Sequence, residues 1–264
     1  MSDFLRVQGQ RIEFQQIHVK SGAPVMVFLH EGLGSVAMWL DFPERLARAA
    51  GVNALLYSRY GYGKSDALGG PRRPGYLHDE ALKTLPELLD RLAVERPILF
   101  GHSDGASIAL LYAGSHSPRA VVAVAPHVFV EAVALDGVRA IRNGYERGGL
   151  RAKLAHYHDD PDSAFYGWND IWGSDDFRDW CIEEALAGIE CPVLAVQGLQ
   201  DEYATMQQLD RMAGKIRRLE TLKMDHCRHS PHRDQPAALI DATVHFCRQI
   251  DTPNGRETAL YPEP

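Results

Sequence analysis

The chain has 264 residues, of which 45% are hydrophobic and 24% are charged, and its formal net charge is −7. These fractions are typical of globular proteins, and they exclude a disordered chain, a collagen-like chain and a disulfide-dense mini-protein. The acidic balance argues against a nucleic-acid-binding surface, because neutralising phosphates requires a stripe of Lys and Arg side chains.

Six segments have the pattern of β-strands, and most of them are continuously apolar. In chain order they span residues 11–19, 25–30, 53–58, 97–102, 120–126 and 191–198. A continuously apolar run is typical of a strand that is buried on both faces of a parallel sheet. The segment 11–19 (RIEFQQIHV) instead alternates apolar and polar residues, which predicts an exposed antiparallel strand at the edge of the sheet.

Helical patterns occupy the intervals between these strands. They span residues 36–50, 78–94, 104–115 and 236–250. Strands that alternate with amphipathic helices of this length predict β-α-β units. The expected fold class is therefore α/β, with a mostly parallel central sheet that is flanked by helices.

The alternation of strands and helices stops between residues 131 and 188, where the composition shifts toward Trp, Tyr, His and Asp. We interpret 131–188 as a helical cap that is inserted into a core formed by residues 1–130 and 189–251. Residues 252–264 are polar and contain Pro and Gly, so we expect a loosely ordered tail there.

Aromatic residues gather in the inserted segment, which contains three of the four tryptophans: Trp168, Trp172 and Trp180. Aromatic side chains dominate burial wherever they lie. The three rings therefore form either the small core of the insertion itself or an apolar wall that a substrate contacts. The sequence leaves both interpretations open.

The loop after the strand 25–30 raises an alternative function. Its residues 32–37 (GLGSVA) match the dinucleotide-binding fingerprint G-x-G-x-x-G/A. The next strand ends on Ser58 and Arg59 instead of the acidic residue that holds the ribose of NAD, so this alternative is an NADP-dependent oxidoreductase. The run that follows, SRYGYGKS, resembles a phosphate-binding loop, but Ser58 replaces its first glycine, and we expect a structural turn.

The sharpest motif is GHSDG (101–105), which ends the strand 97–102 and begins a helix. On such a strand-to-helix turn a serine adopts strained backbone angles, and its Oγ stands above the sheet. Gly101 and Gly105 remove the Cβ atoms that would collide there. A serine hydroxyl is a weak nucleophile at neutral pH, so Ser103 needs a nearby imidazole that a carboxylate orients.

Candidates for both partners follow the strand 191–198. Asp201 lies just beyond this strand, and Glu202 competes with it because the reach of the carboxylate to the imidazole matters more than its identity. The run HCRHSPHRDQP then supplies three histidines: His226, His229 and His232. We expect no metal site in this run, because the order Ser, Asp, His already explains one histidine and the run lacks the ligand set of an open site.

With this order of residues the chain resembles the α/β-hydrolase superfamily from about residue 11 to 250. In that family a histidine opens a stretch similar to H-x-P-H-x-x-x-P before the last helix, and HSPHRDQP matches this register. The resemblance implies that Ser103 is the nucleophile, Asp201 the acid and His229 the base. It also implies a structural role for His232, and His226 is the fallback base.

The resemblance also places an oxyanion hole. One donor is the backbone N–H of the residue after the nucleophile, Asp104, whose side chain should turn away from the reacting centre. The early loop supplies the other donor. Family members more often have H-G-x-x-G-S in that loop, so Glu31 replaces the first glycine and Gly32 takes the donor position. A salt bridge to the scaffold is the alternative role of Glu31. The expected substrate contacts are Glu31, Leu33, Trp168 and Trp172.

The resemblance implies a serine hydrolase that cleaves a small apolar or aromatic carboxylic ester, a thioester or a lactone through an acyl-enzyme, with no cofactor. The insertion looks like the lid that the family places over the active site. Carbon–carbon bond hydrolysis and cofactor-free perhydrolysis use the same triad and remain alternatives. A non-catalytic binding protein on the same fold is a further alternative.

The sequence also suggests where the protein works. No apolar run approaches the roughly 18 residues that span a bilayer, and the segment MSDFLRVQGQRIEF lacks the apolar centre of a signal peptide. The four cysteines include no C-x-x-C pair, a pattern typical of reduced, buried thiols. We expect a cytoplasmic protein that takes a small-molecule substrate, has no membrane or nucleic-acid partner and is a possible homo-oligomer.

Overall fold

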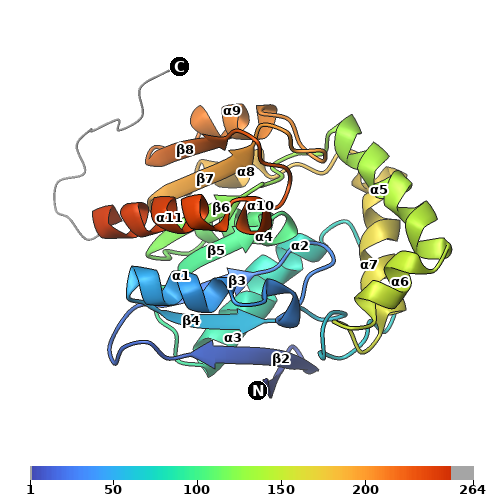
Figure 1. The fold of residues 1–264 in the computed structure, drawn as a ribbon, viewed down its shortest axis with the longest axis horizontal. Helices are drawn as coiled ribbons and strands as arrows, with labels where there is room; N and C mark the ends of the chain where they lie inside the picture. Colours follow the sequence, from blue (N-terminus) through green and yellow to red (C-terminus); the bar gives the residue numbers. More distant parts are fainter. Residues whose placement is uncertain (1, 251–264) are drawn as a thin grey trace.

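The computed structural model describes residues 2–250, in which eight strands form one sheet in the order β1-β2-β4-β3-β5-β6-β7-β8 (Figure 1). The strands are β1 (Asp3–Val7), β2 (Gln10–Ile17), β3 (Val25–Leu29), β4 (Asn53–Tyr57), β5 (Ile98–His102), β6 (Ala120–Val124), β7 (Val193–Gly198) and β8 (Leu219–Met224). Strand β2 pairs antiparallel with β1 and β4, and every later pair is parallel. The expected α/β fold class is confirmed.

Two strands were not expected, and both lie at the edges of the sheet. Only one of the six residues of β8 is buried, and β1 joins β2 through Gln8 and Gly9, whose φ angles are 50° and 78°. Such a turn suits a tight hairpin. The prediction that the segment 11–19 is an edge strand is wrong, because β1 covers that edge. Its alternating pattern reflects antiparallel pairing in the more exposed part of the sheet.

Helices cover both faces of the sheet and bury alternate residues of the central strands. One face carries α1 (Phe42–Ala50) and α11 (Pro236–Ile250), which cross the near side of the sheet in Figure 1. The other face carries α2 (Tyr76–Asp79), η2 (Glu80–Thr84), α3 (Leu85–Arg91), α4 (Asp104–Ala113), α8 (Glu183–Leu186) and α9 (Gln207–Ala213). Burial on both faces explains why the strand sequences are continuously apolar.

Three helices of the inserted segment lie together beside the sheet, on the right of Figure 1: α5 (Ala132–Glu146), α6 (Gly149–Leu154) and α7 (Pro161–Trp172). Their own small core is Tyr145, Leu154 and Phe165, and the rings of Tyr145 and Phe165 stack 3.7 Å apart. The short elements η1 (Ala37–Trp39), η3 (Asp175–Phe177) and α10 (Pro231–Asp234) complete the described helices.

The three tryptophans of the insertion belong to the main core cluster instead of this small core. Trp168, Trp172 and Trp180 are 9%, 2% and 7% exposed, and they pack with residues of the sheet and of α4. The rings also contact one another and other rings of the insertion, Trp168 with Phe165 and both Trp172 and Trp180 with Phe177, so they join the insertion's aromatic residues to the main core. Their rings close the interface between the inserted helices and the sheet.

One buried histidine ties the inserted segment to two loops of the core. The Nδ1 of His158 accepts the backbone N–H of Gly63 at 2.8 Å, so its Nε2 carries the proton and donates to the carbonyl of Leu33 at 2.9 Å. Beside it, the N–H of Asp159 donates to the carbonyl of Gly63.

The tail predicted for 252–264 lies outside the described residues. Among the described helices, none is long and apolar enough to cross a membrane.

Candidate active site

Ser103 lies on a strained turn between β5 and α4. Its φ and ψ angles are 54° and −118°, which non-glycine residues rarely adopt. A Cβ on Gly101 would lie 2.2 Å from the carbonyl oxygen of Gly105, and a Cβ on Gly105 would lie 1.9 Å from that of Leu29. The expected reason for both glycines is confirmed, since any side chain there would push α4 off the sheet.

His229 faces Ser103 from the loop between β8 and α10. Its Nε2 lies 3.0 Å from Ser103 Oγ, and its Nδ1 lies 2.9 and 3.0 Å from the two carboxylate oxygens of Asp201. An ionised carboxylate only accepts, so Nδ1 donates to Asp201, and Nε2 is left to accept the serine proton. The loops after β5, β7 and β8 thus bring Ser103, Asp201 and His229 into one hydrogen-bonded line.

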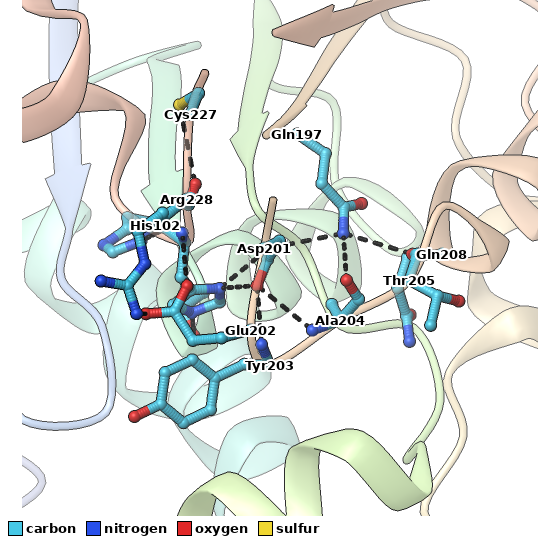
Figure 2. A network of polar contacts seen from close by, with 12 residues as sticks. His102, Gln197, Asp201, Glu202, Tyr203, Ala204, Thr205, Gln208, Cys227 and Arg228 are labelled. Carbon is cyan, nitrogen blue, oxygen red and sulfur yellow. Dashed lines mark hydrogen bonds and ion pairs between the residues drawn. The ribbon is translucent and has the colours of Figure 1, made fainter. Parts of the chain in front are cut away.

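The Asp201 side chain is fully buried in a turn that its own Oδ1 organises by accepting the N–H groups of Tyr203 and Ala204 (Figure 2). Burial alone would raise the pKa of Asp201. The hydrogen bond and charge of His229, together with the Tyr203 N–H, outweigh burial and hold this pKa below its usual value. The carboxylate is therefore ionised wherever His229 could act as a base.

The competing residues of the sequence prediction have other contacts. Glu202 accepts the backbone N–H of His229 and pairs with Arg228 at 3.0 Å, so it does not contact the imidazole. His226 points away, with 91% of its side chain exposed. His232 is buried against the rings of Trp39 and His102. Of the acids and histidines that the sequence offered, the structure thus brings Asp201 and His229 to Ser103 and leaves Glu202, His226 and His232 with other contacts.

The two expected oxyanion donors, the N–H groups of Gly32 and Asp104, come from the loop after β3 and from the start of α4. No hydrogen bond within residues 2–250 uses the backbone N–H of Gly32 or of Asp104. The carbonyl of the Glu31–Gly32 peptide points to the opposite side, where it accepts from Arg59 Nη2 at 2.8 Å and from His30 Nδ1 at 2.7 Å. These bonds fix the direction of the Gly32 N–H, because a peptide is planar and trans.

A buried ion pair connects the second donor to the same arginine. Arg59 and Asp104 are each 1% exposed, and the Arg59 guanidinium lies 3.4 Å from Asp104 Oδ2. The hydroxyl of Tyr76 donates to that same oxygen at 2.7 Å, and Trp172 Nε1 donates to the hydroxyl at 2.9 Å. The Asp104 side chain therefore turns away from the reacting centre, as expected. Sequence reasoning assigned no such role to Arg59 or Tyr76, although an arginine at the end of an apolar strand was a usable signal.

The four expected substrate contacts have different surroundings. The Glu31 carboxylate lies 3.6 Å from His102 Nδ1 and 3.8 Å from Arg233, which matches the scaffold alternative. Burial would raise the pKa of Glu31, but the neighbouring His102 imidazole, whose Nδ1 lies 3.6 Å from the carboxylate, holds this pKa well below the usual value. Leu33 is half-buried and bonded to the insertion through its carbonyl. Trp172 contacts Tyr76.

Trp168 covers the first oxyanion donor. A Cβ on Gly32 would lie 2.1 Å from Trp168 Nε1, so only a glycine fits beneath this indole ring. The same contact leaves no room for the pyrophosphate that the dinucleotide fingerprint would place on residues 32–37. The loop also leads into the three-residue helix η1 and not into a long helix. The missing long helix argues against the NADP-dependent alternative, because that fingerprint binds a pyrophosphate at the start of a helix.

His127, which sequence reasoning did not single out, lies beside the triad after β6. Its ring is 5.6 Å from that of His229 and 5.1 Å from that of Trp172, measured between centroids. Burial, followed by the charge of His229, lowers the pKa of His127 to about 3, so the ring is neutral at physiological pH. Among residues 2–250, no three His, Cys, Asp or Glu side chains gather as a metal-binding group.

Comparison with known proteins gives one family model and several relatives. The model described as "Alpha/beta hydrolase family" matches residues 26–242. A proline iminopeptidase of Lactobacillus helveticus is 26% identical over 113 residues, which are 43% of this chain and 38% of that protein. The chain thus matches well under half the length of this curated relative.

Two solved structures share the fold over nearly their whole lengths. A proline iminopeptidase of Mycobacterium smegmatis has a TM-score of 0.76 at 17% identity, with 95% of this chain and 99% of that chain covered. The enol-lactonase from Burkholderia xenovorans LB400 has a TM-score of 0.74 at 19% identity, with 93% and 100% covered. Identities this low establish similarity of fold alone.

Proposed function

Because this chain belongs to the alpha/beta hydrolase family, we propose that it is a serine hydrolase that cleaves a small apolar or aromatic carboxylic ester through an acyl-enzyme on Ser103. The observation that carries the proposal is the hydrogen-bonded line from Ser103 Oγ through His229 to Asp201, with distances of 3.0 and 2.9 Å. A line of this geometry activates a serine without a cofactor.

The first half of the reaction forms the acyl-enzyme. Ser103 Oγ attacks the ester carbonyl while its proton passes to His229 Nε2, and the resulting imidazolium is stabilised by the ionised Asp201. The tetrahedral oxyanion accepts the backbone N–H groups of Gly32 and Asp104. The carbon–oxygen bond of the ester then breaks as His229 returns the proton to the departing alcohol.

The second half releases the acid. Water enters where the alcohol was, His229 Nε2 takes one of its protons, and the water oxygen attacks the acyl carbonyl through the same oxyanion hole. When the bond between Ser103 Oγ and the acyl carbon breaks, His229 returns the proton to the serine. Thioesters and lactones follow the same two steps with a thiol or a tethered alcohol as the leaving group.

The charges around the site favour an ester over a peptide with a free amino terminus. An aminopeptidase needs an anionic group that is free to bind the terminal ammonium. The carboxylates of this site within residues 2–250 are already paired: Glu31 with His102 and Arg233, Asp104 with Arg59, Asp201 with His229, and Glu202 with Arg228. The neighbouring rings of Trp168 and Trp172 suit an apolar acyl or alcohol group.

We further propose that α5, α6 and α7 act as a lid. Ser103 is 7% exposed and the His229 side chain 13% exposed, so a substrate has little access to either group in this arrangement. Trp168 and Trp172 of α7 contact the oxyanion loop and Tyr76. Movement of α7 would uncover the serine, and its return would exclude water from the reaction.

The direct test is turnover of short aryl esters, thioesters and lactones, with Ser103→Ala as the control. From comparable serine enzymes, the substitution should lower kcat by roughly 10⁴-fold to 10⁶-fold. A fluorophosphonate should label the unmodified chain on Ser103 and leave the variant unlabelled. Prolyl anilides form the peptidase arm of the panel. Retention of most ester turnover by the variant, or turnover of the prolyl anilide alone, would contradict the proposal.

A further inference from the structure

His127 is a buried polar group at the proposed catalytic centre that the proposed mechanism does not use. It is 3% exposed, and its Nδ1 has no hydrogen-bond partner. A buried polar group without a partner is costly for folding, and the large majority of such groups are paired. The unpaired Nδ1 of His127, beside His229 and Trp172, is therefore available to bind a polar group of a ligand.

The backbone holds this ring in a fixed place. The hydroxyl of Ser107 on α4 donates to the carbonyl of His127 at 2.6 Å, and the side chain of Gln208 on α9 accepts the N–H of Val128 at 2.7 Å. The preceding strand β6 ends on Val124 between β5 and β7. Two helices and the centre of the sheet thus determine where the imidazole lies, which is the preorganisation that a binding group needs.

The neighbours of the ring place it within reach of a bound ester. The ring contacts His229 on one side and Trp172 of α7 on another. His229 Nε2 lies 3.0 Å from Ser103 Oγ, so His127 is one side chain removed from the reacting serine. The apolar wall of Trp172 and the polar ring of His127 would contact the same part of a substrate.

We propose that His127 forms a hydrogen-bonding subsite for an uncharged oxygen, a hydroxyl or a carbonyl, carried by the substrate close to the ester group. This inference rests on the proposed function and narrows its substrate class from plain esters to oxygen-substituted ones. Because the imidazole is neutral, with one donor and one acceptor nitrogen, it suits an uncharged group better than an ammonium or a carboxylate.

The test compares substrates in which one hydroxyl replaces one methyl group. For the acyl side the pair is p-nitrophenyl lactate and p-nitrophenyl isobutyrate. For the alcohol side it is the 2-hydroxyethyl and n-propyl esters of benzoic acid. The quantity measured is the ratio of kcat/KM within each pair, in the unmodified protein and in His127→Phe. Dividing one protein's ratio by the other's cancels the intrinsic reactivity of the esters.

Loss of one hydrogen bond should lower the hydroxyl-to-methyl ratio of one pair by about tenfold in His127→Phe. The pair that responds identifies the side of the ester that His127 contacts. His127→Gln keeps a donor and an acceptor and should restore part of the ratio. His232→Phe is the matched control, because His232 is also buried with an unpaired Nδ1 but contacts Trp39, Phe42 and His102 instead of His229. Its ratios should stay unchanged.

Failure of this inference is distinguishable from failure of the proposed function. If the fluorophosphonate labels Ser103 in both the unmodified protein and His127→Phe, and neither ratio changes more than about twofold, the subsite is absent. An equal fall of the ratios in His232→Phe would also overturn it. If the unmodified protein is not labelled at Ser103, the proposed hydrolase activity itself fails, and the subsite with it.

Discussion

Arg59 contacts the segments that carry both proposed oxyanion donors. It holds the carbonyl of the Glu31–Gly32 peptide at 2.8 Å and the carboxylate of Asp104 at 3.4 Å. Arg59 therefore acts on the reaction only through the direction of two backbone N–H groups, so it is a positioning residue. Oxyanion donors lower a barrier only if they already point at the place where the charge develops.

We expect Arg59→Met to lower kcat by about 10²-fold with a much smaller change in KM, because misdirected donors weaken transition-state binding more than substrate binding. Steady-state kinetics on an aryl ester measure this difference. Arg72→Met is the matched control, since the guanidinium groups of Arg59 and Arg72 both lie over the Tyr62 ring, at 4.8 and 5.0 Å, but Arg72 bonds to the Tyr60 carbonyl and to neither donor segment. Arg72 also lies over the Tyr76 ring at 4.9 Å, so the control shows any effect that passes through Tyr76. If Arg59→Met raised KM and left kcat unchanged, the positioning role would be contradicted.

At the scale of elements, a few hydrogen bonds join the inserted helices to the core. His158 bonds to Gly63 and to Leu33, and Leu33 follows the proposed donor Gly32. At the other end of the segment, the contact from Trp172 to Tyr76 reaches Asp104. A series of hydrogen bonds thus connects each side of the proposed oxyanion hole to the proposed lid.

His158→Phe removes the two side-chain hydrogen bonds by which His158 holds Gly63 and Leu33, so the segment α5–α7 should open more often. We expect limited proteolysis to cut within residues 131–172 several times faster and KM for an aryl ester to rise. The control is His156→Phe, a change at a neighbouring exposed histidine. Equal cleavage rates in the two variants would show that His158 does not hold the segment closed.

At the scale of the whole molecule, buried histidines should make the fold sensitive to acid. Burial, followed by the charge of His229 for His127 and of His102 for His232, lowers the pKa of each residue to about 3. In the unfolded chain a histidine titrates near 6.5. Below that pH the unfolded state binds protons that the folded state does not, so stability is complete above about pH 6.5 and falls as the pH drops toward 3.

Between about pH 6.5 and pH 3, each such histidine should lower the free energy of unfolding by about 1.4 kcal/mol for every unit by which the pH falls. Urea denaturation at pH 7, 6 and 5 measures the slope. His232→Phe should make the slope shallower by that amount, because Phe does not titrate in either state. Identical slopes for the variant and the unmodified protein would contradict the prediction, whatever the absolute stability of the variant.

The sequence alone predicted the fold class from local patterns, and it predicted the proposed line of Ser103, Asp201 and His229 from local patterns together with the family resemblance. Continuous apolar runs specify strands that are buried on both faces, and GHSDG requires its glycines within five residues of chain. Asp201 and His229 follow strands β7 and β8, and the parallel sheet places the carboxyl ends of those strands at the same edge as the end of β5, with β6 between β5 and β7. Strands β1 and β8 lacked such a pattern because edge strands need not be apolar.

Only the tertiary structure decided the residues that orient the site. Arg59, Tyr76, His127 and His158 belong to separate segments, and no spacing in the sequence links them. Their contacts depend on how loops from neighbouring strands and the inserted helices meet at the carboxyl ends of the sheet. The same applies to the tryptophans, which composition alone assigned equally to a small core or to a substrate wall. Hydrogen bonds and burial are properties of side-chain positions in three dimensions, and local sequence patterns do not specify those positions.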